Sequence, residues 1–178
     1  MKVYGDAYWA SVQAPNDTFE PVWQVDLAVN AETAKALKAA GLNPRGNQAK
    51  CFEGIGEEPN GRTIFKIKRK VNNPKTNKPN KPPVCLGPDG KPFDDLIGNG
   101  SKVAVQINIY EWKNSFGAGV GGDFAAIRVL DLVEFRKPDG AELLEEGEDP
   151  SVLTAEEANS VLADDELAFD DDLPDVLA

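Results

Sequence analysis

Apolar and polar residues alternate along several segments of the chain with the period of two that is typical of β-strands. The alternation is clearest at residues 21–29, PVWQVDLAV, and at residues 102–113, KVAVQINIYEWK, and it predicts half-buried strands there. Segments rich in β-branched and aromatic residues predict further strands at 3–13, 62–71 and 124–135, and residues 84–93 hold a short strand and a Pro-Asp-Gly turn at 88–90.

One helix interrupts this series of strands, over residues 31–41, AETAKALKAAG. Asn30 can cap its first turn, and Gly41 can end it. Five or six strands with one or two short helices predict an all-β class. A small, closed or nearly closed antiparallel barrel is the economical architecture, because closure removes exposed strand edges.

Charge divides sharply near residue 137. All 19 Lys and Arg lie in residues 1–137 with 15 Asp and Glu, a net +4, whereas residues 138–178 carry 15 Asp and Glu and no cation, a net −15. We therefore place a domain boundary between 137 and 138, and expect a folded body followed by an acidic, largely disordered tail. Such a tail can cover the body's own basic surface and be displaced by a nucleic acid.

Composition excludes several classes of protein. No run approaches the ~18 apolar residues of a membrane span, and the first residues lack the apolar stretch of a signal peptide. We therefore expect a cytoplasmic protein whose two cysteines, Cys51 and Cys85, are reduced and partly buried. The chain contains no histidine, the commonest metal ligand and general base. Since no nucleophile lies near a base in any motif, we expect no catalysis, no metal and no cofactor.

The strand at 102–113 has two contrasting faces. The apolar face predicts core positions at Val103, Val105, Ile107 and Ile109. Its opposite face carries Lys102, Ala104, Gln106, Asn108, Tyr110 and Trp112. Two large rings two residues apart on a polar face are typical of a platform on which nucleic-acid bases stack. The alternative is that a loop or the tail covers these rings.

The stretch from 62 to 91 is strongly basic. It holds nine Lys and Arg and one acid, Asp89, a net +8 that predicts polyanion binding, although a charge run is more often only a solvated face. Strand alternation places Arg62, Lys66, Lys68 and Lys70 on one face, and a basic, proline-rich loop follows at 72–83. Further candidate contacts are Trp9, Phe116, Lys113 and Arg128.

A glycine-rich segment, GAGVGG at 117–122, matches the pattern G-x-G-x-x-G. A dinucleotide site needs that motif between a strand and a helix, whereas a strand-like segment follows here. The segment therefore predicts a flexible hairpin loop that could close over a ligand.

Near the end of the chain, apolar residues stand among acids. Phe169, Asp170, Asp171, Asp172 and Leu173 form a pattern that suits a short peptide docking into a basic groove of a partner.

Three segments together resemble the phage replicative single-stranded DNA-binding proteins: VWQVDLAVNAETAKALKAAGL, IGNGSKVAVQINIYEWKNSFGAGVGG and FAAIRVLDLVEF. In that family an oligonucleotide/oligosaccharide-binding (OB) barrel precedes an acidic tail. Residues 170–174 also look like the tips of bacterial single-stranded DNA-binding proteins. Those tips typically end on an aromatic residue, whereas this chain ends Val176-Leu177-Ala178.

The resemblance implies an OB-fold DNA-binding domain over residues 1–137 and sequence-independent binding of single-stranded DNA in phage replication, recombination and repair. It also implies polymerase and helicase or primase partners for the tail, and it leaves a homodimer open. A different class remains as an alternative, an acidic-tailed interaction or DNA-mimic protein that binds an enzyme without binding DNA. A carbohydrate-binding or small-ligand OB module is a third, but it would not need the basic segment.

Overall fold

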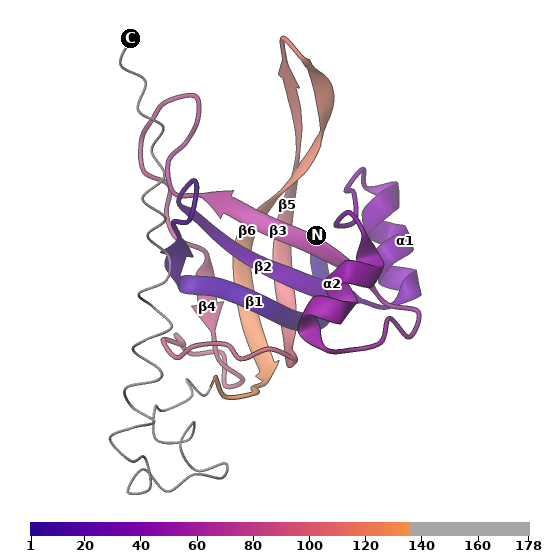
Figure 1. The fold of residues 1–178 in the computed structure, drawn as a ribbon. Helices are drawn as coiled ribbons and strands as arrows, with labels where there is room; N and C mark the ends of the chain where they lie inside the picture. Colours follow the sequence, from indigo (N-terminus) through magenta and orange to yellow (C-terminus); the bar gives the residue numbers. More distant parts are fainter. Residues whose placement is uncertain (136–178) are drawn as a thin grey trace, which may run out of the picture. The chain divides into compact units, whose positions relative to one another are not determined.

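The computed structural model describes residues 1–135 of the chain, and the predicted acidic tail, 138–178, lies outside the described residues (Figure 1). Two helices follow the second strand, and the remaining strands come after them. The elements are β1 (Lys2–Asn16), β2 (Val22–Val29), α1 (Ala31–Ala39), α2 (Gln48–Ile55), β3 (Thr63–Lys70), β4 (Val84–Leu86), β5 (Ser101–Asn114) and β6 (Gly117–Asp131).

Five of the strands close into a barrel. They pair in the order β3-β2-β1-β5-β6, and β6 returns to pair with β3. The barrel neighbours are antiparallel except at the β3–β6 closure, which is parallel. The short β4 also pairs with β6, in parallel orientation. The predicted all-β class, with a small OB-like barrel and two short helices, is confirmed.

The barrel core follows from the inward-facing residues of the alternating strands. Val25 and Leu27 of β2, with Val103 and Val105 of β5, are fully buried inside it. Trp23 also belongs to this core, because it lies on the apolar face of β2. Burial of such side chains stabilises the fold by about 1.5–3 kcal/mol each relative to exposure.

Helix α1 begins where the sequence predicts, because Asn30 accepts a hydrogen bond from the Thr33 amide. It ends at Ala39, two residues before the predicted end, and Gly41, which follows the Ala40 cap, takes a left-handed conformation with φ 94°. Helix α2 was not recognised as a separate element. Its signals are Asn47, which caps it, and Gly56, which ends it in the left-handed region.

Helix α2 corrects the prediction that β2 is only half buried, and it covers part of β3 as well. Its Phe52 packs against the outer face of the barrel, on Tyr8, Ala28 and Ile64. The alternation of β2 and β3 correctly identifies the inner face, but it does not reveal that a short helix buries part of the outer one.

Asp26 is the charged residue on this covered face of β2. Its side chain is 5% exposed and pairs with the Arg45 guanidinium, while its Oδ1 has no hydrogen-bond partner among the described residues. Burial raises the pKa of the Asp26 carboxyl, and the charges of Arg45 and Lys66 offset that effect only in part. Arg45 is therefore the group that makes a buried carboxylate tolerable at this position.

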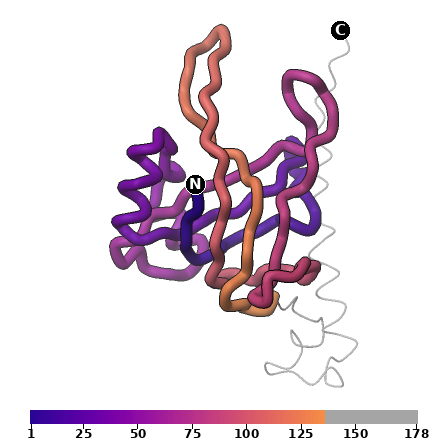
Figure 2. Tube along the Cα trace, turned by 180° about the vertical axis from the view of Figure 1, so that it is seen from behind, coloured from indigo at the N-terminus to yellow at the C-terminus, as the bar shows by residue number. Residues whose placement is uncertain are grey.

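The hairpin of β5 and β6 continues beyond the barrel as a twisted two-stranded arm, residues 109–122. In both views the arm rises between the two helices on one side and the loop 72–83 on the other (Figures 1 and 2). At its base, Val120 and Gly122 lie against the Gly41–Leu42 turn that follows α1.

The arm overturns two expectations. Residues 117–122 are a strand, not a flexible loop, because each of them pairs with a residue of β5 and the turn is confined to Ser115 and Phe116. Ile109 is exposed instead of belonging to the core, because β5 has already left the barrel at this point.

Cys51 and Cys85 are unbridged and partly buried, as predicted. Burial raises the pKa of the Cys85 thiol to about 11, so it stays protonated at neutral pH. Neither described helix is long and apolar enough to cross a membrane.

Replacing Arg45 by Ala should lower the free energy of unfolding at pH 7 by about 2–4 kcal/mol, because it leaves the Asp26 carboxylate buried and unpaired. The deficit should shrink as the pH falls toward about 4, because the raised pKa of Asp26 lets it take up a proton in the folded state first. Urea denaturation of the full chain at several pH values measures both effects. The double variant Arg45→Ala/Asp26→Asn should recover most of the loss, and a deficit independent of pH would contradict this account.

Candidate nucleic-acid interface

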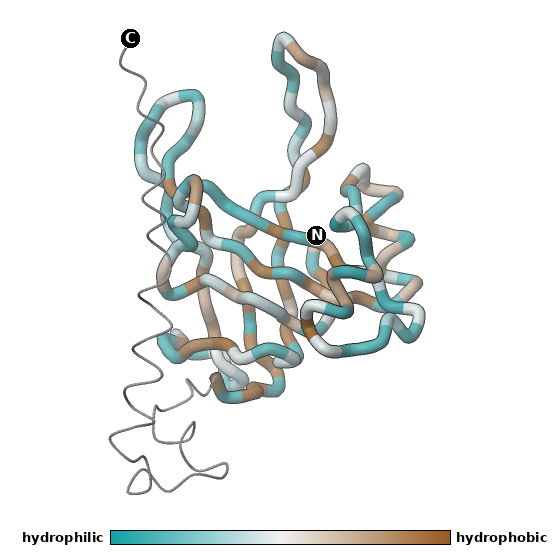
Figure 3. Tube along the Cα trace, in the orientation of Figure 1, coloured by the Kyte–Doolittle hydropathy of each residue, from teal (hydrophilic) through white to brown (hydrophobic). Residues whose placement is uncertain are grey.

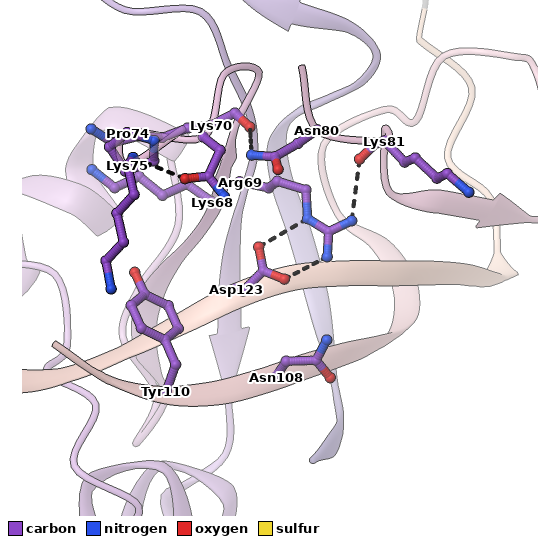
Figure 4. A pocket seen from close by; sticks show the side chains of 11 residues that line it. Lys68, Arg69, Lys70, Pro74, Lys75, Asn80, Lys81, Asn108, Tyr110 and Asp123 are labelled. Carbon is purple, nitrogen blue, oxygen red and sulfur yellow. Dashed lines mark hydrogen bonds and ion pairs between the residues drawn. The ribbon is translucent and has the colours of Figure 1, made fainter. Parts of the chain in front are cut away.

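A groove runs between β3, the loop 72–83 that follows it, and the base of the arm (Figure 4). Strand β3 and the loop supply its cations, while β5 and β6 supply a ring, an amide and one carboxylate. Its lining residues are Lys68, Arg69, Lys70, Asn73, Pro74, Lys75, Asn80, Lys81, Asn108, Tyr110 and Asp123.

The single carboxylate of the groove is already paired. Asp123 accepts hydrogen bonds from two nitrogens of the Arg69 guanidinium, with Nε at 2.9 Å from Oδ1. This contact raises the pKa of Arg69 further, so Arg69 is always charged. Bidentate pairs of this kind fix geometry as well as charge. Arg69 and Asp123 therefore form a rigid, nearly neutral floor.

The remaining cations give the groove its positive charge. Lys70 lies 2.9 Å from a Glu20 carboxylate oxygen. Within residues 1–135, no carboxylate lies within 4.0 Å of Lys68, Lys75 or Lys81. Three lysines without counterions around one groove produce a local positive potential that attracts a polyanion.

The loop 72–83 is held by hydrogen bonds to the end of β3 and to Val71, the residue that follows it. The Asn80 amide donates to the Val71 carbonyl at 2.7 Å, and the Asn80 side chain donates to the Lys70 carbonyl at 2.9 Å. Arg69 also donates to the Lys81 carbonyl at 3.2 Å. The loop is hydrophilic along most of its length (Figure 3). Within the groove, Lys75 extends toward Tyr110 (Figure 4).

The aromatic side of the site lies on the arm. Tyr110 lines the groove and is 50% exposed, and Trp112, the next outward residue of β5, is 42% exposed. Phe116 occupies the turn at the tip of the arm and is 98% exposed. These rings offer open faces to planar ligands, beside the lysines of the groove.

Other predicted contacts lie elsewhere on the barrel. Trp9 is at the opposite end of β5 from Tyr110, where its amide donates to the Asn99 side chain. Lys102 and Arg62 line a second hollow, and Arg62 is bound to the carboxylates of Asp6 and Glu57.

The last three predicted cations are also spread out. Lys66 lies opposite Asp26 in the β2–β3 pairing, on the side of the barrel that α2 covers. Lys113 belongs to the arm, but to the face opposite the two rings. The Arg128 guanidinium donates to the Pro88 carbonyl at 2.8 Å, in the turn after β4. Of the predicted cations, therefore, only Lys68 and Lys70 line the groove.

The structure adds groove residues that the sequence did not single out as contacts, chiefly Arg69, Asp123, Lys75 and Lys81. Alternation places Arg69 on the core side of β3, where a charge requires a partner. That requirement was the available signal for an acid such as Asp123 on the strand beside β3. Lys75 and Lys81 were counted in the basic segment, but their position depends on how the loop folds back.

No protein-family model and no curated protein matches the chain. Solved structures do match the chain. Gp2.5 of bacteriophage T7, a single-stranded DNA-binding protein, is 20% identical with a TM-score of 0.53, and the match covers 87% of this chain and 98% of that one. The single-stranded DNA-binding protein of bacteriophage Enc34, solved in complex with single-stranded DNA, is 13% identical with a TM-score of 0.48, over 78% of this chain and 88% of that one. The likeness to gp2.5 shows a shared fold, and the structural neighbours of this chain are phage single-stranded DNA-binding proteins, as the sequence resemblance predicted.

Proposed function

We propose that this chain is a non-enzymatic, sequence-independent single-stranded DNA-binding protein. The observation that carries the proposal is the groove, in which Lys68, Lys75 and Lys81 have no counterion among residues 1–135 and lie around the exposed ring of Tyr110. The exposed ring of Trp112 follows Tyr110 along the arm. The fold agrees, since its neighbour gp2.5 of bacteriophage T7 is described as a single-stranded DNA-binding protein.

The chemistry of the groove divides into two tasks. Lys68, Lys75 and Lys81 neutralise phosphates, which every nucleic acid carries in the same form. Tyr110 and Trp112 stack on bases, which all present an aromatic face. Neither contact reads the edge of a base, so binding depends little on sequence. Phe116 at the tip of the arm is a third ring within reach of a long strand.

The acidic tail adds a second function to the proposal. With a net charge of −15, it competes with DNA for the basic groove. Its Phe169, Asp170–Asp172 and Leu173 recruit replication proteins, such as a polymerase or a helicase-primase. The sequence resemblance supports this part, together with roles in phage replication, recombination and repair in the host cytoplasm.

Removing either ring should weaken binding of a ~30-nucleotide strand by about 1–3 kcal/mol, because one stacked base loses its partner. The variants are Tyr110→Ala and Trp112→Ala, and the measurement is fluorescence anisotropy of a labelled strand at fixed salt. Trp9→Ala is the matched control, since Trp9 is equally exposed but lies at the other end of the barrel. Equal losses for Trp9 and Trp112 would contradict a binding site on the arm.

Neutralising a groove lysine should reduce the dependence of affinity on salt. When a protein makes one phosphate interaction fewer with a single strand, the slope of log K against log salt becomes shallower by about 0.7. Lys75→Gln and Lys68→Gln should each show this change, whereas Lys50→Gln, an exposed lysine of α2, should not. Titrations at several salt concentrations measure the slope, and unchanged slopes in both groove variants would exclude these lysines as phosphate ligands.

Ending the chain at Lys137 should raise affinity for the strand, because the competing −15 charge is gone. The gain should be largest at low salt, where electrostatic competition is strongest. The same anisotropy titration, run on the full and shortened chains, measures it. Unchanged or weaker binding would disprove competition by the tail. Complete absence of DNA binding in both chains would favour the alternative of a DNA-mimic or interaction protein.

A further inference from the structure

The two platform rings lie directly over two glycines of the neighbouring strand. Tyr110 pairs with Gly121 and Trp112 pairs with Gly119 across the β5–β6 hairpin. A Cβ added to Gly121 would lie 2.5 Å from Cζ of Tyr110, and one added to Gly119 would lie 2.7 Å from Cζ2 of Trp112. Any side chain at either position would therefore displace the ring above it.

Backbone conformation does not explain these two glycines. The left-handed glycines of the described chain include Gly117, at φ 150°, but neither Gly119 nor Gly121. Other residues could adopt the backbone of both positions, and glycine weakens a strand because it loses more conformational entropy and offers no side chain to pack. The reason for glycine here is the space that the rings occupy.

This seating determines what the rings can bind. A ring that rests on a glycine backbone has one covered face and one open face, which agrees with the half exposure of Tyr110 and Trp112. Successive outward residues of a strand are ~6.7 Å apart. Bases along one strand of a duplex are ~3.4 Å apart. Successive bases can therefore stack on successive rings only when the strand is extended and its bases are unstacked.

We propose that Gly119 and Gly121 are positioning residues that seat Trp112 and Tyr110 as one-faced platforms, and that this seating selects an extended single strand, one base per ring. The inference rests on the proposed DNA-binding function and deepens it. It also explains why Gly119 and Gly121 of the GAGVGG segment are two residues apart, a spacing that places both on one face of the strand.

The variants Gly121→Ala and Gly119→Ala test whether these glycines position the rings of Tyr110 and Trp112. Each should weaken binding of a ~30-nucleotide single strand about as much as loss of the ring itself, in the range of about 5- to 150-fold. Gly46→Ala is the matched control, since it has open space around its Cβ position and no left-handed backbone. In the Tyr110→Ala background, Gly121→Ala should cost nothing further, because no ring remains to displace.

Two results would overturn the proposal. One is unchanged affinity in both glycine variants. The other is an equal loss of affinity from Gly121→Ala with and without Tyr110, which would mean that the substitution disturbs the arm itself and not the position of the ring.

A measurement without DNA separates this question from the proposed function. Acrylamide should quench the fluorescence of Trp112 more in unliganded Gly119→Ala than in the parent chain, with Trp112→Phe giving the background of the other tryptophans. Equal quenching would reject the seat at Gly119, whether or not the chain binds DNA.

Discussion

The contact between Arg69 and Asp123 is the interaction on which both the barrel and the groove depend. It lies where the sheet closes on itself, since Lys68 of β3 pairs with Asp123 of β6 at that point. The same guanidinium also reaches the Lys81 carbonyl and so ties down the loop that bears Lys75. A charge-assisted, bidentate pair is well suited to this position, because it fixes direction as well as distance. Closure of the fold and formation of the binding surface are thus a single structural event.

Alternation of apolar and polar residues was enough to predict most of the strands, and the need to remove exposed strand edges then predicted the barrel. Strong local signals, such as the Asn30 cap and the apolar face of β5, are independent of the rest of the chain. The exposure of Tyr110 and Trp112 was predicted for the same reason. Alternation could not predict α2 or the burial of Asp26. The packing of a helix on one face of a sheet is a tertiary contact, and the sequence of the strand alone does not show which element covers it.

The groove was predictable only in part. Charge density identified the segment 62–91. The grouping of Arg62, Lys66, Lys68 and Lys70 as one surface depended only on the alternation of side chains along a strand. In the structure Arg62 is engaged by two carboxylates and Lys66 lies toward the helical side, while the folded-back loop supplies Lys75 and Lys81 instead. The prediction of a flexible loop at residues 117–122 is wrong for a related reason. The role of the glycines there depends on the side chains of a different strand, and a single-strand pattern contains no information about them.

The structure of the arm has a consequence for its thermal stability. Beyond Asn108 its two strands pair with each other and with no third strand of residues 1–135, and such a ribbon is marginally stable by itself. Its support from the rest of the described chain comes from the Gly41–Leu42 turn, which packs on Val120 and Gly122 at the base. Local opening is easiest where buried apolar contacts are few. The arm should therefore fray at temperatures at which the barrel is still folded, and the aromatic platform would be lost before the protein itself melts.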